Sequence, residues 1–225
     1  MNVQDFLPTR TLVNPVPNQA PNQNITELIH ENLELIELAQ TEAEIARLLA
    51  RRGYDAEALA AGMELCHAAQ AALTASQAAI YTQQQAEAEY ERQYAAARQA
   101  FLDYRAASLP LVKGGVRRYE LALDGKVPEK PLQFIAMASS GYKVAFNWAA
   151  YLAVLKQSEV GLIRLETGCA SLEALIAADE ANETAKAVAI DAMIEYDEAA
   201  ARLRDWCRRF RRTVRSVLNA SRSIT

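Results

Sequence analysis

Residues 55–109 read DAEALAAGMELCHAAQAALTASQAAIYTQQQAEAEYERQYAAARQAFLDYRAASL. Between Gly53 and Pro110 this stretch contains no proline and one glycine, Gly62, and it is dominated by Ala, Gln, Glu, Arg and Leu. These residues cost little in a helix, so the stretch predicts one continuous helix. At about 1.5 Å per residue such a helix spans roughly 80 Å, which is typical of coiled coils and long helical bundles. We therefore expect an all-α fold.

The last third of the chain repeats this pattern. A shift of 106 positions (62 to 168) superimposes Gly62 on Gly168 without a gap. Other identical pairs are Leu59 with Leu165, Tyr90 with Tyr196, Arg98 with Arg204, and Arg105 with Arg211. We interpret the match as an internal duplication of a shorter helix, a tight turn and a long helix. Chance overlap of two Ala-rich helices is the alternative.

The predicted architecture is an elongated, antiparallel, four-helix-bundle-like fold made of two such hairpins. Its segments are an extended Pro/Asn/Gln-rich arm (1–24), a first hairpin (25–109), a connector (110–130), a second hairpin (131–219) and a tail (220–225). Asn24 is the predicted cap of the first helix. Thr41 and Glu44 form a second capping box, which predicts a break nearby. Gly53 and Asp55 are the predicted end and start of the helices on either side of the first turn.

The apolar stripe of both long helices is interrupted. Polar residues and alanine occupy positions 82–89 and 179–186, between two apolar halves in each case. This pattern predicts a bend, or a helix that leaves one bundle and enters another.

The segment 132–156 is apolar around nearly its whole circumference. A helix of this kind is buried, either in a core or against a partner. We assign it as interface, through Phe134, Ile135, Tyr142, Phe146, Trp148 and Tyr151. Membrane insertion is the alternative, although Lys143 at mid-span makes it costly.

Short motifs resemble those of an uncharacterised bacterial family of all-helical proteins. They are Arg52-Gly53-Tyr54-Asp55 followed by Leu59 and Gly62, and the turn Leu123-Asp124-Gly125-Lys126. The resemblance implies two duplicated helical hairpins, and since the family has no known activity it implies no functional residues. The second unit departs from the pattern, with Glu159-Val160-Gly161 in place of the first turn.

Both histidines of the chain occur in a Glu-x-x-His motif. The four residues, Glu27, His30, Glu64 and His67, are the candidate metal ligands, because paired copies of this motif hold dinuclear sites in four-helix bundles. With the turn near Gly53, the two motifs lie about 20 Å apart along the hairpin. We therefore expect neither a metal nor another cofactor.

Catalytic signatures are absent from the sequence. It has no nucleophile elbow, phosphate-binding loop or dinucleotide fingerprint, so we do not expect an enzyme. The cysteine count is odd, with Cys66, Cys169 and Cys207, and no export signal or membrane span precedes or interrupts the fold. These features predict reduced thiols and a cytoplasmic location, with signal-independent export left open.

Charge separates along the chain although the net charge is only −4. Arg208, Arg209, Arg211 and Arg212 lie near the end of the second long helix, and the first helix is rich in Glu. We assign these arginines to an interface with acidic residues of the same chain or another copy, rather than with nucleic acid. The predicted function is self-assembly into a homo-oligomer or filament through the long helices and the arm. The alternatives are a membrane-active helical protein and a metal-binding four-helix bundle.

Overall fold

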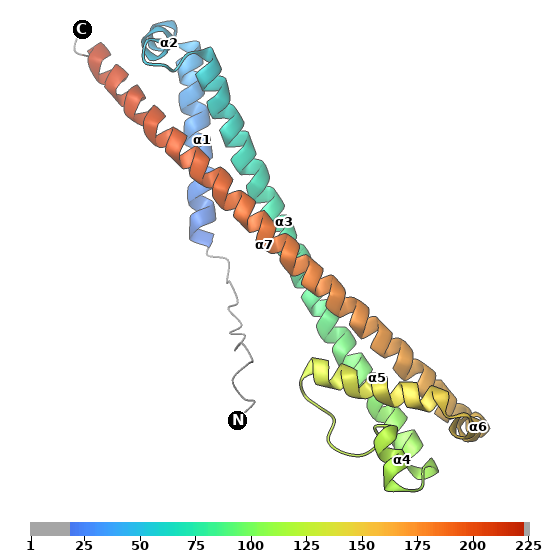
Figure 1. Cartoon of the computed structure of the whole chain (residues 1–225). Coiled ribbons are helices and arrows are strands. Elements are labelled where there is room, and N and C mark those ends of the chain that lie inside the picture. Colours follow the sequence, from blue (N-terminus) through green and yellow to red (C-terminus); the bar gives the residue numbers. More distant parts are fainter. Residues whose placement is uncertain (1–18, 223–225) are drawn as a thin grey trace, which may run out of the picture. The chain divides into compact units, whose positions relative to one another are not determined.

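The computed structural model describes the backbone of residues 19–222 and the side chains of residues 25–158 and 161–219. This part of the chain is helical and has no strand, which confirms the all-α prediction (Figure 1). Its α-helices are α1 (Gln19–Thr41), α2 (Ala43–Ala50), α3 (Ala56–Ser108), α4 (Gly115–Glu120), α5 (Pro131–Asn147), α6 (Ala149–Gln157) and α7 (Glu159–Arg222). The predicted long helices are thus α3, with 53 residues, and α7, with 64.

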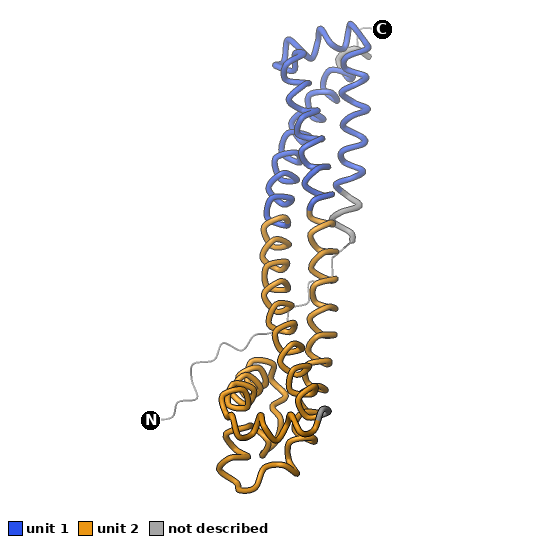
Figure 2. Tube along the Cα trace, turned by 90° about the vertical axis from the view of Figure 1, so that its right-hand side faces the viewer, with its two compact units in different colours: residues 1–75, 193–225 blue, residues 76–192 orange. Residues whose placement is uncertain are grey.

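The chain forms two compact units, and both long helices contribute to each of them (Figure 2). Unit 1 combines Met1–Ala75 with Met193–Thr225, and unit 2 is Ser76–Ala192. The units therefore cut across the predicted hairpins, because the two ends of each long helix pack against different short helices. The interrupted apolar stripes predicted either a bend or a passage from one bundle to another; the polar stretches 82–89 and 179–186 both lie within unit 2.

Unit 1 is built from α1, α2, the beginning of α3 and the end of α7. Within it α3 runs antiparallel to α1 and α7 (Figure 1). Its buried apolar residues form two neighbouring clusters: Ile25, Ile29, Cys66, Ala69, Leu73, Tyr196, Ala199, Ala200, Leu203 and Cys207, and then Ile36, Ala39, Leu49, Leu59, Phe210, Val214 and Val217.

The turn between α2 and α3 has the predicted chemistry. Gly53 has a φ of +84°, which favours glycine, and the Asp55 carboxylate accepts a hydrogen bond of 2.9 Å from the Ala58 amide. The Arg52 guanidinium donates to the Ser216 hydroxyl at 2.6 Å, which ties the turn to α7. Both predicted signals, the glycine and the cap, are confirmed.

The Asp55 cap gives a first stability prediction. Asp55→Ala leaves the Ala58 amide without its side-chain acceptor, so we expect a loss of about 1 kcal/mol in the free energy of unfolding of unit 1. Chemical denaturation followed by the fluorescence of Trp206 measures it. Asp55→Asn keeps an acceptor and is the matched control; an alanine variant as stable as the wild type would contradict the cap.

One helix start and one helix cap differ from the prediction. α1 begins at Gln19 and not at Asn24, because Pro21 falls in the first turn, where its missing N–H is not needed. The break near Thr41 is confirmed, since α1 ends there and α2 starts at Ala43. The capping box is wrong, however: the Thr41 hydroxyl donates to the carbonyl of Glu37 at 3.0 Å instead. The rest of the predicted arm, residues 1–18, lies outside the described residues.

Unit 2 is built from the end of α3, α4, α5, α6 and the beginning of α7. Its core contains Ala97, Phe101, Tyr104, Val112, Leu121, Ala122, Leu123, Val127, Phe134, Ala138, Tyr142, Ala145, Tyr151, Leu155, Leu165, Leu172 and Leu175. The predicted connector thus supplies core residues and is more than a link. Arg98 and Arg105 of α3 hold it, by donating to the carbonyls of Pro128 at 2.5 Å and Leu123 at 3.0 Å.

The apolar segment 132–156 is not one helix. Trp148, with φ −100° and ψ 92°, separates α5 from α6. Among the described residues no helix is both long and apolar enough to cross a membrane. Of the two predicted environments for this segment, a core or a partner, Phe134, Tyr142 and Tyr151 lie in the core of unit 2.

Candidate functional site: an arginine groove

The six aromatic and apolar residues predicted as interface lie in three environments. Phe134, Tyr142 and Tyr151 are buried in unit 2, where Phe134 and Tyr142 both contact the ring of Phe101 at 5.7 Å between centroids. Their assignment to an interface is wrong for this structure, because their own chain covers them. Ile135 and Trp148 are partly buried, and of the six only Phe146, 42% exposed, lies largely on the surface.

The arginines at the end of α7 form a charge cluster in unit 1. Arg204, Arg208, Arg211 and Arg215 recur at spacings of four, three and four residues, so they share one side of the helix. A separate stripe of α7 is buried against α1 and α3. The helical period therefore places a row of guanidinium groups beside α1.

Three adjoining surface hollows of about 330 to 350 Å³ each follow this row. The first is lined by Glu31, Glu34, Leu35, Arg211, Val214, Arg215 and Leu218, the second by Arg208, Arg211, Arg212 and Arg215, and the third by Leu28, Arg204, Cys207, Arg208 and Arg211. They share Arg211, so we treat them together as the arginine groove. It brings together three of the four predicted arginines and leaves out Arg209, whose guanidinium donates to the carbonyl of Asp205.

Arg211 is held in place by α1. It forms an ion pair of 2.6 Å with Glu31, and its Nε donates to Oδ1 of Asn32 at 3.4 Å. Asn32 is fully buried, and its amide donates to the carbonyl of Leu28 at 2.5 Å. The predicted interface between arginines and the acidic first helix thus exists within one chain, at this one position.

The other arginines of the groove have weaker partners or none. Arg208 lies 3.6 Å from Asp205 on its own helix. Within the described residues, Arg204, Arg212 and Arg215 form no ion pair, and their side chains are exposed. Five arginines therefore line a groove with two glutamates, which leaves it positively charged and open to an anionic group.

Cys207 lies beneath the arginines. Burial raises the pKa of its thiol to about 12, so the thiol is protonated at neutral pH. A protonated, buried thiol is a poor nucleophile. The chemistry that this groove offers is charge recognition.

The candidate metal ligands are not gathered into a site. His30 pairs with Glu34 at 3.2 Å, and both side chains are largely exposed. In the part of the chain that the structure describes, no group of three His, Cys, Asp or Glu residues is placed to hold a metal ion.

Glu31, Glu34, Arg204 and Arg215 also line the groove and were not among the predicted site residues. The spacing of the arginines on α7 could have predicted Arg204 and Arg215, because it places them on the same side of the helix as Arg208 and Arg211. The two α1 residues had no such signal, since their place beside α7 depends on packing between segments far apart in sequence.

No protein-family model, curated protein or solved structure matches this chain. The resemblance to a bacterial helical family therefore stays a prediction, and function is argued from the geometry.

Proposed function

We propose that this protein self-associates, and that two copies pack against each other through their arginine grooves. The observation that carries this proposal is the opposite charge of the two walls. Glu31 and Glu34 on α1 line the same hollow as Arg211 and Arg215 on α7, together with the apolar Leu35, Val214 and Leu218. This first hollow carries two negative and two positive side chains, so this part of the groove can be its own complement.

Symmetry makes the pairing specific. A two-fold axis along the groove, between two facing copies, puts α1 of each copy opposite α7 of the other. Glu34 of each copy then lies opposite the arginine row of the other copy. The same contact therefore forms twice, as in an isologous dimer. The arginines without an ion pair in one copy would then pair with the exposed Glu34 of the other copy.

We also propose that the fold arose by duplication of a helical hairpin. The same shift of 106 positions that aligns the glycines carries Glu42, at the first helix break, onto Trp148, at the second. It also matches buried residues: Ala39 with Ala145, Leu49 with Leu155, Leu59 with Leu165, Cys66 with Leu172, Ala69 with Leu175, Ala97 with Leu203, Phe101 with Cys207, and Tyr104 with Phe210. Burial at matching positions supports a common origin more strongly than Ala-rich composition does. A four-helix arrangement of two hairpins is part of the same proposal.

The test is the molar mass in solution, by light scattering after size exclusion. We expect a dimer that weakens as salt rises, because exposed charges are screened. Glu34→Lys and Arg215→Glu should each weaken dimerisation by about tenfold or more, since each turns two attractions into repulsions. Mixing the two variants, or combining both changes in one chain, restores opposite charges and should restore the dimer.

Two controls make the result specific. Glu64→Lys changes the net charge equally at an exposed position of α3 outside the groove, and it should leave the dimer intact. A wild-type chain that is monomeric at low salt would overturn the proposal, and so would reversal variants that do not rescue each other. Growth beyond a dimer requires a second contact, for which we propose the N-terminal arm. A chain lacking residues 1–18 should then stop at the dimer.

A further inference from the structure

The short helix α4 is fastened to unit 2 by arginines. The Nε of Arg118 donates to the carbonyl of Val112 at 2.9 Å, and its Nη2 donates to that of Leu109 at 3.3 Å. The guanidinium of Arg117 lies 4.8 Å from the ring centroid of Trp148. Directly after α4, Leu121 and Leu123 are buried in the core. The backbone on both sides of α4 is therefore held firmly.

This firmly held helix exposes large apolar side chains. Val116 is 75% exposed and Tyr119 is 80% exposed, and their spacing of three residues places them on the same side of α4. Leu111, just before the helix, is 37% exposed. We call Leu111, Lys113, Val116 and Tyr119 the α4 tip. Burial within the chain does not explain these side chains, because they contribute little to the core.

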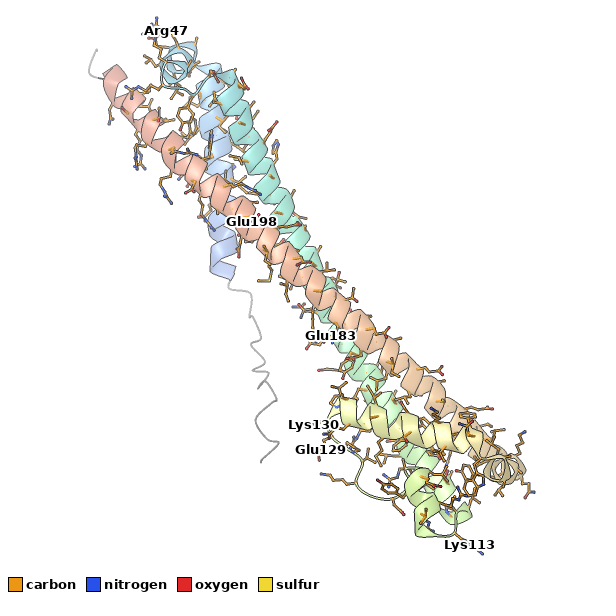
Figure 3. All side chains as sticks on the ribbon, viewed as in Figure 1. Arg47, Lys113, Glu129, Lys130, Glu183 and Glu198 are labelled. Carbon is orange, nitrogen blue, oxygen red and sulfur yellow. The ribbon has the colours of Figure 1, made fainter. Side chains whose placement is uncertain are left out.

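The segment that carries the α4 tip, residues 109–157, has a formal charge opposite in sign to that of the remaining chain. Residues 109–157 contain seven Lys or Arg and three Asp or Glu, so their formal charge is +4, and the remaining residues sum to −8. Lys113 projects outward beside α4 (Figure 3), and it forms no ion pair with any described residue. Arg117 shares its charge with Glu120 at 2.9 Å. Lys113 and Arg117 therefore provide the positive charge at the tip that can attract an anionic partner.

We infer that the α4 tip docks on the surface of anionic lipid bilayers. Tyr side chains favour the headgroup region, where the ring is apolar and the hydroxyl stays hydrated. Val116 and Leu111 would bury apolar surface beside it, and Lys113 would bind lipid phosphates. Such docking needs no membrane-spanning helix, and it leaves the buried aromatic residues of α5 in the core. It is independent of the arginine groove, which lies in unit 1.

Co-sedimentation with vesicles tests this inference on the full chain. We expect binding to vesicles of phosphatidylcholine with phosphatidylserine, and at least tenfold weaker binding to phosphatidylcholine alone. Val116→Ser with Tyr119→Ser should reduce binding to the anionic vesicles about tenfold or more, and Lys113→Glu should reduce it and its salt dependence. Circular dichroism checks that the helical content is unchanged.

The matched control is Tyr81→Ser with Val188→Ser, because these residues are also exposed, at 64% and 54%, on the long helices. This variant should bind like the wild type. Arg215→Glu, which disrupts the proposed dimer and also removes positive charge from the groove, should lower binding less than the tip substitutions do, because it leaves the α4 tip intact. Equal binding to neutral vesicles, or unchanged binding after the tip substitutions, would overturn lipid docking. A change in molar mass caused by the tip substitutions would assign the tip to a protein interface instead.

Discussion

Phe101→Ala is expected to lower the free energy of unfolding of unit 2 by about 3–5 kcal/mol, the range for removing a buried phenylalanine. Phe101 is fully buried on α3, and its ring contacts Tyr104, Phe134 and Tyr142 at centroid distances of 6.1, 5.7 and 5.7 Å. Alanine leaves a cavity between three large rings from two helices. Those rings are fixed by further contacts, so the cavity cannot collapse fully.

Denaturant unfolding measures this loss, and the two tryptophans separate the units. Trp148 belongs to unit 2 and Trp206 to unit 1, so a Trp206→Phe background reports unit 2 alone. Phe146→Ala is the control, because that ring is 42% exposed and its removal should cost about 1 kcal/mol or less. Equal effects of the two substitutions would show that Phe101 is not central to the core.

Gly168→Ala is expected to destabilise unit 2 by about 1–3 kcal/mol through overpacking. A Cβ at Gly168 would meet the Tyr142 hydroxyl and lie 2.7 Å from its Cζ atom. Tyr142 is buried, so its ring has little room to move. Alanine favours a helix over glycine by roughly 0.5–1 kcal/mol, which offsets only part of the clash.

Tyr142→Phe should partly rescue this variant. It removes the nearest atom, a buried hydroxyl that has no hydrogen-bond partner among the described residues. The single change Tyr142→Phe should therefore be close to neutral, and a double-mutant cycle should show favourable coupling with Gly168→Ala. Gly115→Ala is the control, because a Cβ there meets nothing within 4 Å. Additive effects in the cycle would contradict the contact between Gly168 and Tyr142.

Local interactions made much of the fold predictable from the sequence. Helix propensity, the positive φ of Gly53 and the Asp55 cap act within a few residues, so the long helices and the first turn could be read directly. The same holds for the row of arginines on α7, since helical spacing alone puts them on one side. The hydrogen-bond partner of a polar side chain was harder to predict. The Thr41 hydroxyl donates to a backbone carbonyl and does not cap the next helix.

Tertiary structure decided which partner each helix face received. An apolar segment such as α5 can be covered by its own chain or by another, and only packing against α3 buried Phe134 and Tyr142 inside unit 2. The arginine groove likewise depends on Arg211 meeting Glu31, 180 positions away in sequence. The sequence by itself determined the helices and the chemical character of their faces, because these follow from local backbone preferences and spacing. The pairing of those faces depends on the free energy of burial across distant segments, and therefore only the tertiary structure decided it.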